Sequence, residues 1–326
     1  FIMLGSMAGS YELAVIFQKA ETLPENPNFT LSLIFILLGA FTKSAQFPFH
    51  FWLPGAMAAP APVSAYLHSA TMVKAGIYLL ARLMPIYAQS PLWTPVLVSI
   101  GCFTAFWTAL VAFRQTDIKL MLAYTTNTVL GILVCLLGLA NAYALHAALL
   151  FIIAHAAYKA ALFMVIGTID QKTGTRDLHA LSGLKNALKI TFIAAALALA
   201  SKAGLPPLLG FLGKEYTYKA LLEYDPAALG LIIGANILLV AVSMLIFIKP
   251  FFGKEPVTPL KEPPKNSGIF FWLCPLILAL SGLILPVLAL NWMNGIVISP
   301  GALNMAPASK AIDIKLWSGL NAPLFL

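Results

Sequence analysis

The sequence has 326 residues, of which 60% are hydrophobic and 10% are charged, and its formal net charge is +8. Soluble globular domains carry about a quarter charged residues, so this composition, with a mean hydropathy of +0.88, excludes a soluble domain and predicts an integral membrane protein. In a membrane chain, a positive balance indicates basic loops on one side of the bilayer rather than nucleic-acid binding.

The chain begins at Phe1 without an initiator methionine, and we expect it to be part of a longer protein, truncated at both ends. Within a single transmembrane domain, residues 1–28 are predicted to be the end of a preceding helix and a loop, and residues 29–292 the helical core. Residues 293–326 are predicted to be a tail that could begin a further helix.

A bilayer core needs about 20 apolar residues per helix, and this length predicts a bundle of about eight transmembrane helices. They cover roughly residues 29–58, 61–85, 93–113, 119–140, 143–168, 189–222, 227–249 and 269–292. The first and sixth are too long for straight helices, and Pro48, Pro206 and Pro207 must break them. Two discontinuous helices in one chain are typical of the internal repeats of transporters.

The loops between these spans differ in charge. One side receives only Arg82, Glu223 and Asp225, and the other side is basic, with Arg114, Lys119, Lys172, Arg176, Lys185, Lys189, Lys254, Lys261 and Lys265. The basic side is predicted to be cytoplasmic.

No motif indicates a metal, a disulfide or a nucleotide cofactor. Cys102, Cys135 and Cys274 lie singly in apolar runs without CxxC spacing, which favours a role in helix packing. The sequence contains no phosphate-binding glycine loop and no HExxH motif, so we expect no cofactor.

Ionisable residues within the apolar runs are the candidate functional residues, because a charge at the centre of a membrane helix costs about 3 kcal/mol on insertion scales. Lys43, in FTKSAQFPFHFWLP, is expected deep in the bilayer beside the first break. A buried lysine can gain or lose its proton when a nearby charge moves, so it can carry protons. The alternative is a lysine that extends to the interface.

The second and fifth spans carry further candidates. His68 suits a proton relay because histidine titrates in the physiological range, or it could be a packing residue bonded to a carbonyl. Lys74 lies six residues on, on a different face, and is either a second relay group or an anchor near a wet surface. His155 and Lys159 share one helical face four residues apart, as a relay or as a packing pair.

The second break is followed by Lys214 and Glu215, which could bond to each other or to different partners. Lys214 is expected to be the counterpart of Lys43, and the alternative is an interfacial ion pair. Lys202, earlier in the same helix, receives no role, and His146 is expected at the interface.

Four segments in fixed order resemble the antiporter-like subunits shared by Mrp-type multisubunit Na⁺/H⁺ antiporters and respiratory complex I. They are TKSAQFPFHFWLPGAMAAPAPVSAYLHSATMVKAG, QTDIKLMLAYTT, AHAAYKAALFMVIGTID and AGLPPLLGFLGKE. FPFHFWLPGAM and Lys74 are most similar to the large A-type subunits of Mrp antiporters. The resemblance implies an all-α fold of inverted five-helix repeats.

The resemblance also implies roles for individual residues in a proton path. The family's motif residues fall on Lys43 in the first broken helix, His68 between the two halves, Lys119 of the DIK motif, His155, the central Lys159, and Lys214 in the second broken helix. The family's partner for Lys43 is a glutamate on an earlier helix, expected upstream of Phe1. Two positions depart from the family pattern: Phe151 stands where complex I relatives often have histidine, and Lys202 where an apolar residue is usual.

By this resemblance, the chain is expected to be a proton-translocating subunit of a Na⁺/H⁺ or other monovalent cation/proton antiporter, and not an enzyme. Its expected partners are lipid and other membrane subunits, in the plasma membrane of a prokaryote. One alternative is a proton-pumping membrane subunit of an NADH:quinone oxidoreductase, in which the same residues would be driven by electron transfer elsewhere. The other is a scaffold whose buried charges only organise partner helices.

Overall fold

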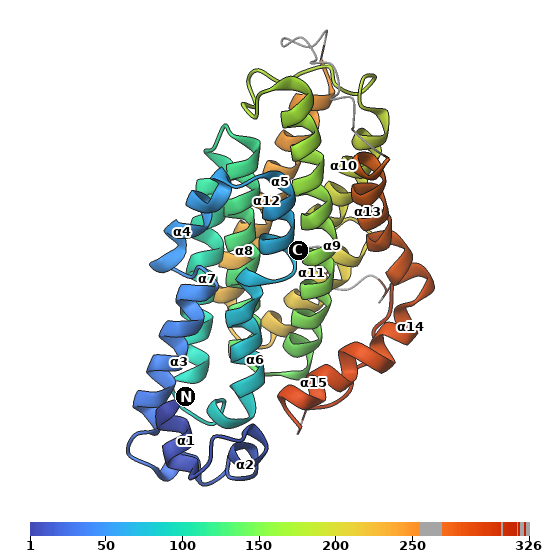
Figure 1. Ribbon diagram of the computed structural model, residues 1–326. Helices are drawn as coiled ribbons and strands as arrows, with labels where there is room; N and C mark the ends of the chain where they lie inside the picture. Colours follow the sequence, from blue (N-terminus) through green and yellow to red (C-terminus); the bar gives the residue numbers. More distant parts are fainter. Residues whose placement is uncertain (254–268, 308, 318, 320–322, 324–326) are drawn as a thin grey trace.

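The computed structural model describes residues 1–326 except 254–268, 308, 318, 320–322 and 324–326 (Figure 1). The regular secondary structure of the described residues is helical, with one isolated β-bridge between Asp117 and Asp177. The prediction of an all-α fold is therefore confirmed for this part of the chain. Lys254, Lys261 and Lys265, assigned to the basic side, lie outside the described residues.

The elements follow one another along the chain without long connections. The first half contains α1 (Ile2–Ala8), α2 (Leu13–Gln18), η1 (Leu23–Glu25), α3 (Phe29–Lys43), η2 (Phe49–Phe51), α4 (Trp52–Gly55), η3 (Ala56–Ala58), α5 (Ala61–Ser69), η4 (Met72–Lys74), α6 (Ala75–Tyr87), α7 (Trp93–Phe113) and α8 (Ile118–Leu139). The second half contains α9 (Ala142–Thr173), α10 (Lys189–Ala203), α11 (Leu209–Leu222), α12 (Pro226–Phe251), α13 (Phe270–Leu288), α14 (Leu290–Met293), η5 (Asn294–Ile298) and α15 (Ser299–Met305).

Five of the described helices are individually long and apolar enough to cross a membrane: α7, α8, α9, α12 and α13. Their bounds lie close to the predicted spans. The other predicted spans are built from shorter helices placed end to end.

Both predicted helix breaks are present. The first separates α3 from η2 and α4 at residues 44–48, and the second separates α10 from α11 at residues 204–208. Each contains a cis peptide bond before proline, at Pro48 and at Pro207.

A third break, which the sequence analysis did not predict, divides the second predicted span into α5 and α6. No proline lies at this point. Instead, the hydroxyl of Thr71 donates to the carbonyl of Tyr66 over 3.0 Å, and the hydroxyl of Ser69 donates to the carbonyl of Ala65. Hydroxyl groups that bond to nearby carbonyls compete with the helical ladder, which accounts for an interruption at residues 70 and 71.

The centre of the bundle is formed by α8 and α9 (Figure 1). The membrane-length part of α8 is 89% buried, whereas that of α13 is only 22% buried. Helix α9 packs against α5, α8, α10, α11 and α13. These two helices therefore position side chains that face the other elements from the middle.

Helices α7 and α8 approach closely through glycine. A Cβ added to Gly131 would lie 2.6 Å from the backbone nitrogen of Ala105, and one added to Gly101 would lie 2.6 Å from that of Cys135. The thiols of Cys102 and Cys135 are buried with their sulfurs 3.4 Å apart. The packing role predicted for these two cysteines fits this contact.

The loops after α7, α9 and α12 lie at the same end of the bundle, the upper end in Figure 1. The nitrogen of Ile118 donates to the carbonyl of Arg176 over 3.0 Å, and that of Leu184 donates to the carbonyl of Pro250 over 3.0 Å. The described residues of the predicted basic side therefore share one end, and its cytoplasmic location stays a prediction.

The tail after α13 contains α14, η5 and α15, which run along α9, with α15 also packed on α6 (Figure 1). An extended segment follows, in which the nitrogen of Ile312 donates to Nε2 of His146 over 3.2 Å. The expectation that His146 lies at the interface is wrong, because the tail covers it and its side chain is fully buried.

We predict that Gly131→Ala destabilises the protein by about 1–3 kcal/mol, because the added methyl group overpacks the contact between α7 and α8. Gly230→Ala in α12 is the matched control, since nothing lies within 4 Å of its Cβ position. That change should be neutral or slightly stabilising, because alanine favours helix. Thermal unfolding of the purified full-length protein in detergent measures both, and equal melting temperatures for the two variants would contradict the close approach.

Candidate functional site

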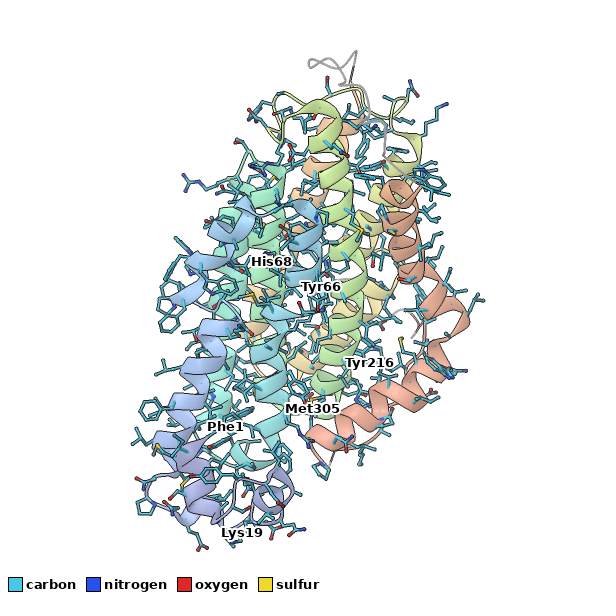
Figure 2. All side chains as sticks on the ribbon, in the orientation of Figure 1. Phe1, Lys19, Tyr66, His68, Tyr216 and Met305 are labelled. Carbon is cyan, nitrogen blue, oxygen red and sulfur yellow. The ribbon has the colours of Figure 1, made fainter. Side chains whose placement is uncertain are left out.

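Buried lysines and histidines gather between the central helices and the helix breaks. Each has 7% or less of its side chain exposed, and together they are His68, Lys74, Lys119, His155, Lys159, Lys202 and Lys214. Figure 2 labels His68 within the bundle, on α5. All but Lys202 belong to the set that the sequence singled out as candidate site residues.

Lys119 lies in the first turn of α8, where the Asp117 side chain caps the helix by accepting from the nitrogens of Lys119 and Leu120. The Nζ of Lys119 donates to the carbonyls of Met57, at 3.0 Å, and of Ala59. Although it was counted among the basic loop residues, Lys119 points inward. It satisfies the carbonyls that end the first broken helix.

Lys159 is fully buried in the middle of α9. Its Nζ donates to the carbonyl of Leu122 over 2.5 Å and to the hydroxyl of Thr125 over 2.7 Å, both on α8. The sequence analysis missed Thr125. The signal was the run Thr125–Thr128, four adjacent polar residues in an apolar helix, all of them buried.

Two histidines lie between the lysines. His68 packs its ring 6.0 Å from that of Phe163, within electrostatic reach of Lys119 and Lys159. His155 is fully buried one helical turn before Lys159, close to the Ser69 backbone and within electrostatic reach of Lys159. The structure thus brings together the predicted pair and connects it through His68 to Lys119.

Lys74 follows the unpredicted break between α5 and α6. Its Nζ donates to the carbonyl of Ile152 on α9 over 2.8 Å, and it lies within electrostatic reach of His155. The break re-aims the chain between His68 and Lys74, so the two residues approach different parts of α9.

The second break holds Lys214, whose Nζ donates to the carbonyl of Ala203, the last residue of α10, over 2.9 Å. Gly204 has φ +85°, and a Cβ there would lie 2.7 Å from the Lys214 Cδ. Glycine is required at this position both for the left-handed backbone and for the space that the lysine occupies.

Glu215 bonds to a partner other than its neighbour Lys214. Its Oε1 lies 2.8 Å from the Nζ of Lys219, one helical turn further along α11. Of the two possibilities that the sequence left open, different partners for Lys214 and Glu215 is the one observed. Glu215 is also the only buried carboxylate among the residues that the structure describes.

Lys43 does not belong to the row. It is exposed at the end of α3, and within the described part of the chain it makes no hydrogen bond or ion pair. The expectation that Lys43 is buried is therefore wrong for this chain, although its place beside the first break is as predicted. The glutamate expected as its partner lies outside the sequence.

The row can bind and release protons, because amines and imidazoles exist in neutral and charged forms. Neighbouring members influence one another electrostatically from Lys119 through His68 and Lys159 to Lys202 and Lys214. Among the described residues, no group of three His, Cys, Asp or Glu side chains is placed to hold a metal ion. The chemistry of the row is that of proton transfer.

Residues 1–240 match the protein family described as NADH:quinone oxidoreductase/Mrp antiporter, transmembrane. Over its full length the chain is 38% identical to the A-type subunit of a Na⁺/H⁺ antiporter from Alkalihalophilus pseudofirmus, and 38% identical to the A/B-type subunit of a probable K⁺/H⁺ antiporter from Rhizobium meliloti. It spans 44% and 33% of the lengths of these relatives.

A chain in the solved structure of the Mrp complex from a Dietzia species is similar to this one. The two are 36% identical with a TM-score of 0.83, and the match covers 99% of this chain and 35% of that chain. At this identity and TM-score, the likeness extends to sequence as well as fold.

We predict that Lys219→Met destabilises the protein by about 3 kcal/mol, because it leaves the buried Glu215 carboxylate without its cation. Adding Glu215→Gln should restore most of this loss, since the remaining amide carries no charge. Thermal unfolding of the full-length single and double variants measures the coupling. Additive losses in the double variant would show that the pair is not coupled.

Proposed function

Because the chain belongs to the NADH:quinone oxidoreductase/Mrp antiporter transmembrane family, we propose that it forms the proton-translocating part of one subunit in a monovalent cation/proton antiporter. The observation that carries the proposal is the continuous row of buried Lys and His side chains from Lys119 to Lys214. The names of the two relatives include both Na⁺ and K⁺, so the cation class is monovalent.

The proposed mechanism is electrostatic. A proton bound at one site of the row repels positive charge at the next, so each transfer changes the proton affinity of its neighbour. Lys119 lies at the basic end of the bundle and receives protons on that side. Passage continues through His68 and Lys159 towards the second break, and it is coupled to cation movement elsewhere in the assembly.

Lys43 has a separate place in this proposal. It stands at the first break with an exposed ammonium group, and no described carboxylate is paired with it. In the complete protein it pairs with a carboxylate from outside the described residues, and protonation of that pair controls entry to the row. The partners are other membrane subunits, as the solved Mrp complex of the Dietzia species supports.

The names of the relatives favour this function over a membrane subunit of an NADH:quinone oxidoreductase, because they are antiporter subunits. The buried amines favour it over a scaffold. A scaffold could replace each lysine with an apolar side chain and avoid the cost of burying a charge, whereas a proton path needs titratable groups.

The experiment that tests the function uses the full-length protein assembled with its partner subunits in everted membrane vesicles. Addition of Na⁺ or K⁺ should collapse a preformed pH gradient, and Lys159→Met should abolish this response while the complex still assembles. Lys249→Met, which removes an exposed lysine from the last turn of α12, is the control. The proposal fails if the wild-type complex shows no cation-dependent proton movement.

We predict that His155→Ala and Lys159→Ala each reduce the transport rate at least tenfold, and that the double variant is little worse than the more damaging single variant. Residues that act in one relay lose their function as a unit, so their effects do not add. The rates are measured in the same vesicles. Multiplicative defects would instead indicate independent packing roles.

We also predict that Thr125→Val shifts the pH profile of transport, because it removes the hydroxyl that accepts from Lys159 and so disfavours the charged amine. The shift should be towards lower pH, at which the less basic amine is protonated. Thr126→Val is the matched control, since the Thr126 hydroxyl donates only to the Leu122 carbonyl. Identical profiles for the two variants would contradict a role for this hydrogen bond.

A further inference from the structure

We propose that Lys202 is a second proton-carrying lysine of the second break, the structural counterpart of Lys43, and that protons pass through it between Lys159 and Lys214. This inference rests on the proposed function and adds a step to it.

The two helix breaks are built alike around these lysines. Lys43 lies in the last turn of α3 and Lys202 in the last turn of α10. Two residues later the backbone turns left-handed in both, at Ala45 with φ +49° and at Gly204 with φ +85°. Proline follows five residues after each lysine.

The hydrogen bonds of the two breaks correspond as well. The nitrogen of Gln46 donates to the Phe41 carbonyl over 2.9 Å, as that of Leu205 donates to the Ala200 carbonyl over 3.0 Å. The same holds for Phe49 to Gln46 at 2.6 Å and Leu208 to Leu205 at 3.0 Å. Every pair is offset by 159 positions, the separation of Lys43 and Lys202.

This register corrects the assignment made from the sequence. At the same offset, Lys214 corresponds to Gly55 in α4 and not to Lys43. The second break therefore carries two lysines, one at the repeat position and one beyond it. The first break carries only Lys43.

The surroundings of Lys202 do not hold a permanent charge. Its side chain is 2% exposed, and its Nζ has no hydrogen-bond partner among the described residues. Lys74, Lys119, Lys159 and Lys214 all donate to carbonyls. Of these buried lysines, Lys202 alone lacks a fixed acceptor, so it is free to reorient between neighbours.

The charged and titratable groups near Lys202 are mostly basic. Helix α9 contributes Lys159 and His155, and α11 contributes Lys214. On α13 there is no charged residue, and Lys249 of α12 is exposed in that helix's last turn. The carboxylate of Glu215 on α11 is already paired with Lys219.

A lasting ammonium at Lys202 would therefore be buried, unpaired and beside other cations, which is costly. A proton that stays briefly fits these surroundings. It arrives when Lys159 releases it and leaves when Lys214 becomes neutral. Since like charges in one site are not occupied together, the proton moves stepwise through the second break.

The test replaces Lys202 by Met, Arg and His in the full-length, assembled complex and measures cation-dependent proton exchange in everted vesicles across pH. Lys189→Met, at the exposed start of the same helix, is the control. Lys202→Met should lower the rate at least tenfold with normal assembly, and Lys202→Arg should do the same because arginine does not release its proton. Lys202→His should retain transport with its pH profile shifted to lower pH, since histidine ordinarily titrates about 4 units below lysine.

The outcomes separate the two proposals. Wild-type rates in Lys202→Met, or full rescue by Arg, would overturn the proton-carrying role of Lys202 and leave antiport intact. Arg rescue would identify a structural positive charge. A wild-type complex without cation-dependent exchange would overturn the proposed function, and the role of Lys202 with it.

Discussion

The site depends on one interaction, the hydrogen bond from a buried lysine ammonium to a backbone carbonyl. Lys74, Lys119, Lys159 and Lys214 all make it, and none of them forms an ion pair with a described carboxylate. Carbonyl dipoles stabilise an ammonium less than a full negative charge does. Each amine is therefore held in position while its proton stays exchangeable, because no permanent counter-charge fixes it.

Much of the fold could be predicted from the sequence, because proline and the length of apolar runs act locally. Pro48 and Pro207 lie in the two breaks that they predicted. The break between α5 and α6 could not be found in this way, since it depends on hydroxyl groups that equally well bond back within an intact helix. The exposure of Lys43 and the burial of His146 depend on what packs over them from distant parts of the chain, which local sequence does not encode.

The site was predictable where helical spacing decides the contacts. His155 and Lys159 meet because they are four residues apart, and the same rule assigns Glu215 to Lys219, since adjacent residues do not face each other on a helix. The acceptors of the lysines were not predictable. Leu122, Ile152 and Ala203 contribute only backbone carbonyls, and nothing in a side chain marks which carbonyl a distant lysine will meet.

The carbonyls that accept from the lysines are of two kinds, and this difference orders the row. Those bound by Lys119 and Lys214 lie at helix ends, where the last carbonyls have no partner within the helix and the helix dipole favours a cation. Those bound by Lys74 and Lys159 lie within continuous helices, and the Leu122 carbonyl also accepts from the hydroxyls of Thr125 and Thr126. A shared carbonyl stabilises an ammonium less than a free one. Positive charge is therefore favoured at the two breaks and disfavoured between them, so a proton in the middle of the row tends to leave for one end or the other.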